Sequence, residues 1–122
     1  MEENIKKILV AEDNEINQKL IQIILIKLNY KFDFVLNGEQ AVNIYDPSKY
    51  DMIFMDLHMP VMDGFEATKI IKKKYHDSKI IAISAEFFPE TMEKCRAIGI
   101  DDFINKPFKI EDIRKVIEKY VN

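Results

Sequence analysis

The sequence predicts an α/β fold, a three-layer, doubly wound domain built around a five-stranded parallel sheet. Short apolar runs recur along the chain, and each is followed by a longer stretch with apolar residues at helical spacing. The runs alternate little with polar residues, which is typical of strands that are buried on both faces. Strands and helices in this alternation indicate a parallel sheet covered by helices on both sides, with right-handed crossovers.

The first half of the chain is predicted to contain three strands separated by two helices. Asn14 is a good helix N-cap after the first strand, and Asn37-Gly38 forms the turn after the second strand. Pro47 stops the second helix. The third strand is a continuous apolar run, too short for a buried helix. The predicted elements are a strand at residues 8–11, a helix at 14–28, a strand at 32–36, a helix at 39–45 and a strand at 52–56.

The second half is predicted to add two strands and three helices. The helix after the central strand opens with Glu66 and ends in three lysines, and both charge clusters suit the helix dipole. Pro89 fits the first turn of the next helix, Gly99 ends it, and Cys95 between them is expected to be a small buried hydrophobe. The elements are a helix at residues 64–75, a strand at 79–83, a helix at 89–98, a strand at 102–104 and a helix at 110–120.

Length and composition bound the class of protein. The 122 residues are 48% apolar and 32% charged, which fits one globular domain over residues 1–122. The net charge of −3 gives no basic field, so we expect this domain alone to bind neither nucleic acid nor a membrane surface. The start of the chain, residues 1–4, leads directly into a strand, and no apolar run is long enough to span a membrane. We therefore expect a soluble, cytoplasmic protein.

Polar side chains follow four of the five predicted strands. Because the carboxyl ends of parallel strands share one edge of a sheet, we expect these side chains to converge on a single crevice. Adjacent carboxylates repel one another unless a cation offsets their charge, and Mg²⁺ suits a site with oxygen ligands and few protein groups. The lysine would balance the remaining charge or meet an anion. The residues, in chain order, are Glu12, Asp13, Asp56, Ser84 and Lys106.

Each of these residues also has an ordinary structural interpretation. An acid at a strand end is commonly a solvated cap, and single serines and lysines in loops are commonly turn hydroxyls and surface amines. The ring of His58 is a possible metal ligand, but one imidazole beside carboxylates gives little support for zinc. Only the combination of residues favours a functional site.

Four motifs carry a resemblance to a known family. They are ED after the first predicted strand, DLHMPVMDG after the third, SA after the fourth and KP after the fifth. Together they resemble the receiver domain of two-component response regulators, over essentially the whole chain. The stretches AEDNEINQKL, NGEQAV and IGIDDFINKPF are most similar to receivers of hybrid sensor histidine kinases. The resemblance implies the flavodoxin-like strand order 2-1-3-4-5 and a cis bond between Lys106 and Pro107.

The resemblance also implies a phosphoacceptor and a metal site. Asp56 would be the residue that is phosphorylated. Asp13 and Asp56 would bind Mg²⁺ directly, and Glu12 would act through a water molecule. The backbone carbonyl of His58 would complete the protein ligands.

Further roles are implied around the phosphoryl group. Ser84 would donate a hydrogen bond to it, and Lys106 would pair with it. Phe103 would fill the space that Ser84 vacates. Many relatives have tyrosine there, and because phenylalanine lacks the tyrosine hydroxyl, this switch would work by packing alone. The side chains of His58 and Glu86 would point outward and tune dephosphorylation.

The implied function is that of a phosphoacceptor in a two-component or phosphorelay system. Asp56 would attack in line a phosphoryl group carried by a phosphohistidine or a small acyl phosphate. The partners would be a sensor histidine kinase, a histidine phosphotransfer protein, or both. The receiver would thus catalyse its own Mg²⁺-dependent phosphorylation and dephosphorylation, whether or not it belongs to a longer kinase. The alternative is a receiver-fold binding module in which phosphorylation is weak or unused.

Other classes that share this fold lack required residues here. A haloacid-dehalogenase-like phosphatase needs a second aspartate two residues after the nucleophile, where this chain has His58. A flavodoxin needs a loop rich in Ser, Thr or Gly after the first strand, where this chain has acids that repel phosphate. A dinucleotide site needs a Gly-x-Gly-x-x-Gly turn, and the three glycines of this chain are not so spaced.

The first helix carries more apolar residues than one buried face needs. The second set is either ordinary exposed surface or, following the resemblance, a docking face for a phosphotransfer helix. The set predicted to face the core is Ile16, Leu20, Ile23, Ile24 and Leu28. The additional set is Ile21, Leu25 and Ile26.

Overall fold

The computed structural model describes residues 7–121, so the expectation for residues 1–4 lies outside the described residues. Ten elements alternate as predicted, with bounds within two residues of the predicted ones. The strands are β1 (Lys7–Ala11), β2 (Phe32–Val35), β3 (Tyr50–Asp56), β4 (Ile80–Ser84) and β5 (Asp102–Asn105). The helices are α1 (Glu15–Lys27), α2 (Gly38–Ile44), α3 (Gly64–Lys74), α4 (Pro89–Ala97) and α5 (Ile110–Val121).

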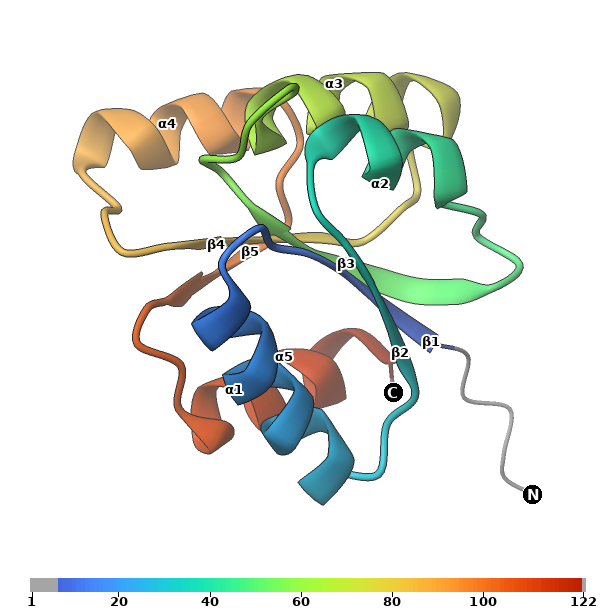
Figure 1. The fold of residues 1–122 in the computed structure, drawn as a ribbon. Helices are drawn as coiled ribbons and strands as arrows, with labels where there is room; N and C mark the ends of the chain where they lie inside the picture. Colours follow the sequence, from blue (N-terminus) through green and yellow to red (C-terminus); the bar gives the residue numbers. More distant parts are fainter. Residues whose placement is uncertain (1–6, 122) are drawn as a thin grey trace.

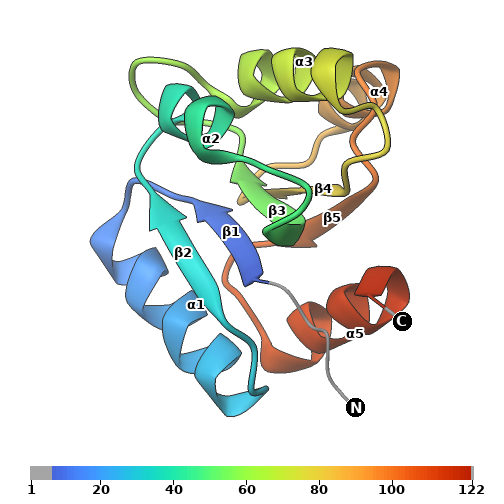
Figure 2. The ribbon, with the colours of Figure 1, turned by 90° about the vertical axis from the view of Figure 1, so that its right-hand side faces the viewer.

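All strand pairs are parallel, and the sheet has the order β2-β1-β3-β4-β5, which confirms the predicted fold class. Helices α1 and α5 cover one face of the sheet, and α2, α3 and α4 cover the other (Figures 1 and 2). Each face has its own core, because successive strand residues point to opposite sides. In β1, Ile8 and Val10 pack with α1 and α5, whereas Leu9 and Ala11 pack on the other face.

Side-chain caps fix where three helices begin, close to the loops at the carboxyl edge of the sheet. Asn14, Asn37 and Asp63 each accept a hydrogen bond of 2.9 Å from the backbone N–H three residues ahead. Each cap satisfies one of the free N–H groups of a first helical turn. The caps therefore define the residue at which each of these loops passes into its helix. In the described part of the chain, no helix combines the length and apolar character needed to cross a membrane.

The predicted inner face of α1 was partly wrong, although Ile24 is buried and Leu20 and Leu28 pack against the core as predicted. Ile21 and Leu25, which were assigned to an additional set, are completely buried. Ile16 and Ile23, which were assigned to the core, are 76% and 55% exposed. Both sets have helical spacing, so the hydrophobic pattern alone does not decide which one faces the sheet. The exposed aliphatic residues of α1 are thus Ile16, Ile23 and Ile26.

Candidate functional site

The carboxyl edge of the sheet carries a polar pocket of about 260 Å³. Because all five strands are parallel, their carboxyl ends lie along this edge, where open α/β sheets bind ligands. The strand-end residues singled out in the sequence all line it, together with two exposed residues of the following loops. These are Glu12, Asp13, Asp56, Ser84 and Lys106, with His58 and Glu86.

Asp56 ends β3 and is 3% exposed. Its two carboxylate oxygens have different partners. Oδ2 accepts a hydrogen bond from Lys106 Nζ at 2.9 Å, and Oδ1 accepts one from the backbone N–H of His58 at 3.0 Å. These contacts from two separate segments hold the carboxylate in one orientation at the base of the pocket.

The ammonium group of Lys106 is shared between two buried carboxylates. Its Nζ lies 2.9 Å from Asp56 Oδ2 and 3.1 Å from Glu12 Oε1. Glu12 Oε1 nonetheless accepts no well-oriented hydrogen bond from the described residues. Burial opposes the charge of Lys106, but the hydrogen bond to Asp56 and the charges of Asp56 and Glu12 outweigh it, so its pKa is raised. The following peptide bond, Lys106-Pro107, is cis, as the resemblance implied.

Three carboxylates meet beside this lysine. Glu12, Asp13 and Asp56 each offer an oxygen, and these oxygens all lie within 4.8 Å of one another. Burial, followed by hydrogen bonding and repulsion from Asp56, raises the pKa of Glu12 to about 7. One ammonium group cannot balance three carboxylates. The cluster therefore has the excess negative charge and the oxygen donors that suit a hard divalent cation.

Ser84 ends β4 and is 2% exposed. Its Oγ accepts a hydrogen bond of 3.0 Å from the backbone N–H of Glu86. As a donor, the hydroxyl reaches only the Glu86 carbonyl at 3.4 Å, which is long for a bond between two oxygens. The hydroxyl proton is thus available to a stronger acceptor in the pocket.

Phe103 lies outside this pocket, on β5 beside Ala82 of β4. Its half-buried ring packs edge-on against Phe87, with ring centres 5.1 Å apart. The guanidinium of Arg96 lies 5.7 Å from the centre of the same ring. The aromatic residue singled out on the fifth strand thus contacts α4 and the loop before it.

Sequence reasoning missed two residues that shape the site. Gln18 Nε2 donates a hydrogen bond to the backbone carbonyl of Glu12, which ties the end of β1 to α1. At Gly64, a Cβ atom would lie 2.2 Å from the carbonyl oxygen of Asp56, so any other residue would push α3 away from the end of β3. The sequence carries a signal for Gln18, which is an amide side chain in the first helical turn after two acids. The close approach at Gly64 depends on tertiary structure and leaves no such signal.

Comparison with known proteins gives a consistent result. Residues 8–118 match the family described as response regulator receiver domain. The hybrid signal transduction histidine kinase B of Dictyostelium discoideum is 38% identical over 134 residues, which cover 98% of this chain but 7% of that protein. The chain spans only 4% to 16% of the length of the curated relatives it matches.

Two solved structures resemble the chain in both fold and sequence. One is the receiver domain of a sensor histidine kinase from Pseudomonas aeruginosa with a magnesium ion in its active-site cleft. It has 34% identity and a TM-score of 0.87, covering 96% of this chain and 98% of that one. The other is a Saccharomyces cerevisiae receiver domain in complex with a histidine phosphotransfer protein. It has 30% identity and a TM-score of 0.86, covering 95% of this chain and 88% of that one.

The family match covers residues 8–118, which is nearly the whole chain, and both solved receiver domains share its fold. The chain belongs to the response regulator receiver domain family.

Proposed function

We propose that residues 1–122 are a single receiver domain in which Asp56 accepts a phosphoryl group from a phosphohistidine. The donor is a sensor histidine kinase, a histidine phosphotransfer protein, or both in turn. The observation that carries this proposal is the position of Asp56, a buried carboxylate held between Lys106 and the His58 backbone inside an acidic cluster. Because such donors are made by kinases that use ATP, we place the domain in the cytoplasm.

The proposed reaction is an in-line displacement at phosphorus. A carboxylate oxygen of Asp56 supplies the electron pair for the new phosphorus–oxygen bond, and the phosphorus–nitrogen bond of the donor breaks. Its electrons return to the imidazole, and the product is an acyl phosphate on Asp56. Phosphoryl transfer requires mainly positioning and charge neutralisation from a protein, and the oriented carboxylate and the Lys106 ammonium supply both.

The acidic cluster fits Mg²⁺, because three carboxylates offer oxygens within one small volume. We assign Asp13 and Asp56 as direct ligands, Glu12 as a ligand through water, and the His58 backbone carbonyl as the remaining protein ligand. A bound divalent cation supplies charge neutralisation for the phosphoryl oxygens. Glu12, whose pKa is raised to about 7, gains most from a nearby cation because its ionised form is the disfavoured one.

Ser84 and Lys106 are proposed to hold the phosphoryl group once it is formed. The new group adds roughly −1.5 to −2 charge units and strong acceptor oxygens. Driving a two-state switch nearly to completion takes about 5.5 kcal/mol. Two charge-assisted hydrogen bonds, each contributing about 1.5–3 kcal/mol, supply about that much. As a donor, the Ser84 hydroxyl has only the long contact to the Glu86 carbonyl, so it loses only this weak interaction when it turns to the phosphoryl group.

Phe103 is proposed to change its packing when Ser84 moves. Its ring has no hydroxyl, and it already packs against Phe87 in the loop before α4. A movement of Ser84 toward the phosphoryl group would let the ring turn inward and change the surface of α4, β5 and α5. Identical Phe103 side-chain populations with and without a phosphoryl mimic, measured by NMR, would rule this switch out. His58 and Glu86, both exposed beside the pocket, are placed to tune dephosphorylation.

The exposed aliphatic residues of α1 are proposed to dock the phosphotransfer partner. Leu25 is not suited to test this, because it is completely buried and its loss would damage the core. Ile23→Glu changes the exposed stripe, and Ile44→Glu, on α2 and 38% exposed, is the matched control. We expect Ile23→Glu alone to slow transfer from a phosphotransfer protein while labelling by acetyl phosphate is unchanged. Equal transfer rates for both variants would exclude docking on α1.

The decisive test is the intact mass of the protein after incubation with acetyl phosphate, with and without Mg²⁺. We expect a gain of one phosphoryl group that requires Mg²⁺ and is lost in Asp56→Asn. Asp77→Asn, which changes an aspartate whose side chain is 96% exposed, is the matched control and should be labelled like the native chain. No gain with the fold intact would instead support the alternative, a binding module that does not use phosphorylation.

A further inference from the structure

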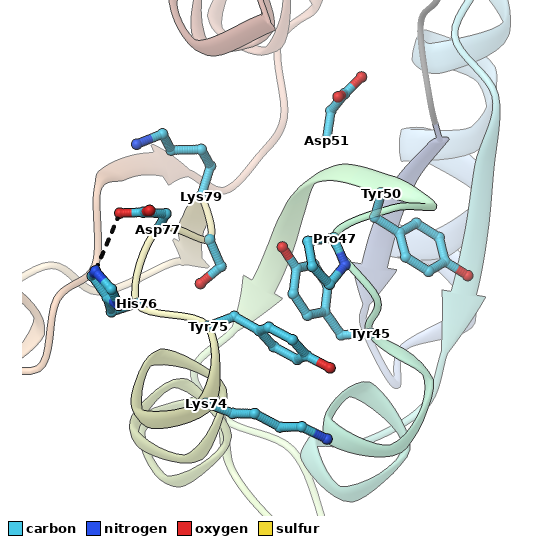
Figure 3. A pocket seen from close by; sticks show the side chains of 10 residues that line it. Tyr45, Pro47, Tyr50, Asp51, Lys74, Tyr75, His76, Asp77 and Lys79 are labelled. Carbon is cyan, nitrogen blue, oxygen red and sulfur yellow. Dashed lines mark ion pairs between the residues drawn. The ribbon is translucent and has the colours of Figure 1, made fainter.

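A second and larger pocket lies at the opposite, amino-terminal edge of the sheet. Its volume is about 460 Å³, which is within the usual range for small-molecule sites. The loop from α2 to β3 and the loop from α3 to β4 form its walls (Figure 3). It shares no lining residue with the phosphoacceptor pocket, so the proposed receiver chemistry leaves it without a role.

One wall of this pocket is aromatic and held in place. The rings of Tyr45 and Tyr75 pack edge to face with centres 5.5 Å apart, and Figure 3 shows them next to each other. Tyr50 stacks on the other side of Tyr45, with ring centres 6.3 Å apart, and its hydroxyl donates a 2.8 Å hydrogen bond to Asp33. Because the array is anchored at Tyr50, the wall is formed before any ligand arrives.

Ser78 adds an unsatisfied hydroxyl to the same pocket. The residue is 5% exposed, and its Oγ has no hydrogen-bond partner among the described residues. Its backbone, in contrast, is fully engaged, since the N–H donates to the Tyr75 carbonyl at 2.9 Å and its carbonyl accepts from Lys72 Nζ. A buried polar group without a partner is costly. The Oγ atom is itself covered, so the Ser78 side chain has to turn toward the pocket before an incoming group can reach the hydroxyl, while the loop backbone stays fixed.

The charges around the pocket do not favour a charged ligand. The lining contains two lysines, Lys74 and Lys79, and two aspartates, Asp51 and Asp77, so their formal charges cancel. In Figure 3 the charged ends of Asp51 and Lys79 point away from the tyrosine rings. The Lys74 ammonium, 5.3 Å from the centre of the Tyr75 ring, would repel a cation.

The surroundings of Tyr45 disfavour an anion as well. Burial raises the pKa of Tyr45 to about 12, and the neighbouring Tyr75 and the charges of Asp46 and Asp51 add to the shift. The same negative charges would repel an anionic ligand, and the hydroxyl remains protonated and able to donate a hydrogen bond. The pocket thus selects by shape, stacking and hydrogen bonding.

We propose that this pocket binds a small, uncharged aromatic molecule. Its ring packs against the partly exposed Tyr75 and against the small exposed part of Tyr45, which is 6% exposed. A polar group at its edge forms a hydrogen bond with Ser78 Oγ once the Ser78 side chain has turned toward the pocket. The site is separate from the phosphoacceptor and gives the domain a second ligand-binding surface.

Three probes of the same shape and different charge test the proposal. Benzamide is uncharged, benzoate is an anion and benzamidine is a cation. Titrated into the ¹⁵N-labelled chain, benzamide should give saturable NMR shifts centred on Tyr45, Tyr75 and Ser78, and the charged probes should bind more weakly. No saturable shifts, shifts centred elsewhere, or equal binding of all three probes would overturn the proposal.

Two variants distinguish the role of the Ser78 hydroxyl in benzamide binding from the general effect of removing a buried hydroxyl. Ser78→Ala should weaken benzamide binding about threefold to tenfold, as expected for one lost hydrogen bond. Thr68→Val removes the hydroxyl of a completely buried residue that lines neither pocket and whose Oγ1 also has no partner among the described residues. It should leave benzamide binding unchanged. Unchanged affinity in Ser78→Ala, or equal losses in both variants, would contradict the role assigned to Ser78.

Discussion

Two lysine–aspartate pairs, one at each edge of the sheet, have the same length and different surroundings. At the amino-terminal edge, Lys72 Nζ lies 2.9 Å from Asp101 Oδ2, and at the carboxyl edge Lys106 Nζ lies 2.9 Å from Asp56 Oδ2. Within residues 7–121, each charge of the first pair has one opposite charge. In the second, a single ammonium group serves Asp56 and Glu12, with Asp13 close by. The carboxyl edge therefore keeps unbalanced negative charge.

The remaining contacts of the two pairs differ in the same way. Asp101 also accepts a 2.9 Å hydrogen bond from the Ile80 backbone, and Lys72 also donates to the Ser78 carbonyl, so this pair links α3, β4 and β5. At the carboxyl edge, Glu12 Oε1 lacks a well-oriented hydrogen bond from the described residues. The comparison indicates that the first pair serves stability, whereas the second is arranged for ligands that bring the missing positive charge.

The largest effect is expected from breaking the amino-terminal pair. Asp101→Asn would leave the Lys72 ammonium, whose side chain is 14% exposed, without its counter-charge. We expect the free energy of unfolding to fall by about 3 kcal/mol, measured by urea denaturation.

Asp56→Asn is the matched change at the carboxyl edge. It relieves repulsion between carboxylates and leaves Glu12 beside Lys106, so the loss should be below about 1 kcal/mol or become a gain. Equal losses of unfolding free energy in the two variants would show that the two pairs contribute equally to stability.

The next largest effect should come from supplying the missing positive charge. Mg²⁺ at about 100 times its dissociation constant is expected to raise the free energy of unfolding by about 2.7 kcal/mol. Asp13→Asn removes one carboxylate of the cluster and should abolish most of this gain, whereas the exposed Asp77→Asn should keep it. Thermal unfolding with increasing Mg²⁺ measures both. Full stabilisation of Asp13→Asn would place the ion elsewhere.

Without Mg²⁺, the excess charge at Glu12 should appear as a dependence of stability on pH. Its pKa is raised from its ordinary value of 4.5 to about 7, so the folded state holds this proton more tightly than the unfolded state. Stability from this group is present below pH 4.5 and is lost as the pH rises through 7.

Glu12→Gln, which stays neutral, is therefore expected to raise the free energy of unfolding at pH 8 by roughly 2 kcal/mol. It should have little effect at pH 4.5, which is the ordinary pKa of this group. Urea denaturation at the two pH values checks the difference, with Glu15→Gln, an exposed acid in α1, as the control. A gain of the same size at both pH values would mean that Glu12 is not the titrating group.

The carboxyl edge was far easier to predict from the sequence than the amino-terminal edge. Glu12, Asp56 and Lys106 each follow an apolar strand, and parallel topology alone brings such positions together. The pair of Lys72 and Asp101 joins residues 29 positions apart on a helix and a loop, and its formation depends on how α3 packs on the sheet. Local patterns contain no signal for such a contact.

The inner face of α1 was not predictable for a related reason. Ile16 and Ile23 fall on one apolar stripe of the helix, and Ile21 and Leu25 fall on another. Periodicity predicts a helix with an apolar face but does not choose between two such stripes. The choice depends on how the helix packs against the sheet, where the second stripe is completely buried.

The smallest expected effect concerns backbone strain at the two edges. At the amino-terminal edge, Asn29 has a φ of 68°, in the left-handed region that asparagine tolerates. At the carboxyl edge, Val61 has a φ of 69° at the centre of a tight turn in which the Met62 N–H donates to the Pro60 carbonyl at 2.7 Å. A β-branched residue is strained in this conformation, so the loop that follows Asp56 is the strained one.

Exchanging the two residue types should reverse the difference in backbone strain between the two edges. Val61→Asn is expected to raise the free energy of unfolding by about 1 kcal/mol, and Asn29→Val to lower it by about the same amount. Urea denaturation measures both, and Val61→Ala, which removes the branch and keeps a Cβ atom, should fall between Val61→Asn and the native chain. Val61 is 77% exposed, so lost packing cannot mask a gain. A loss of stability in Val61→Asn would mean that the turn is held by side-chain contacts and carries no strain, and the two edges would then differ in charge alone.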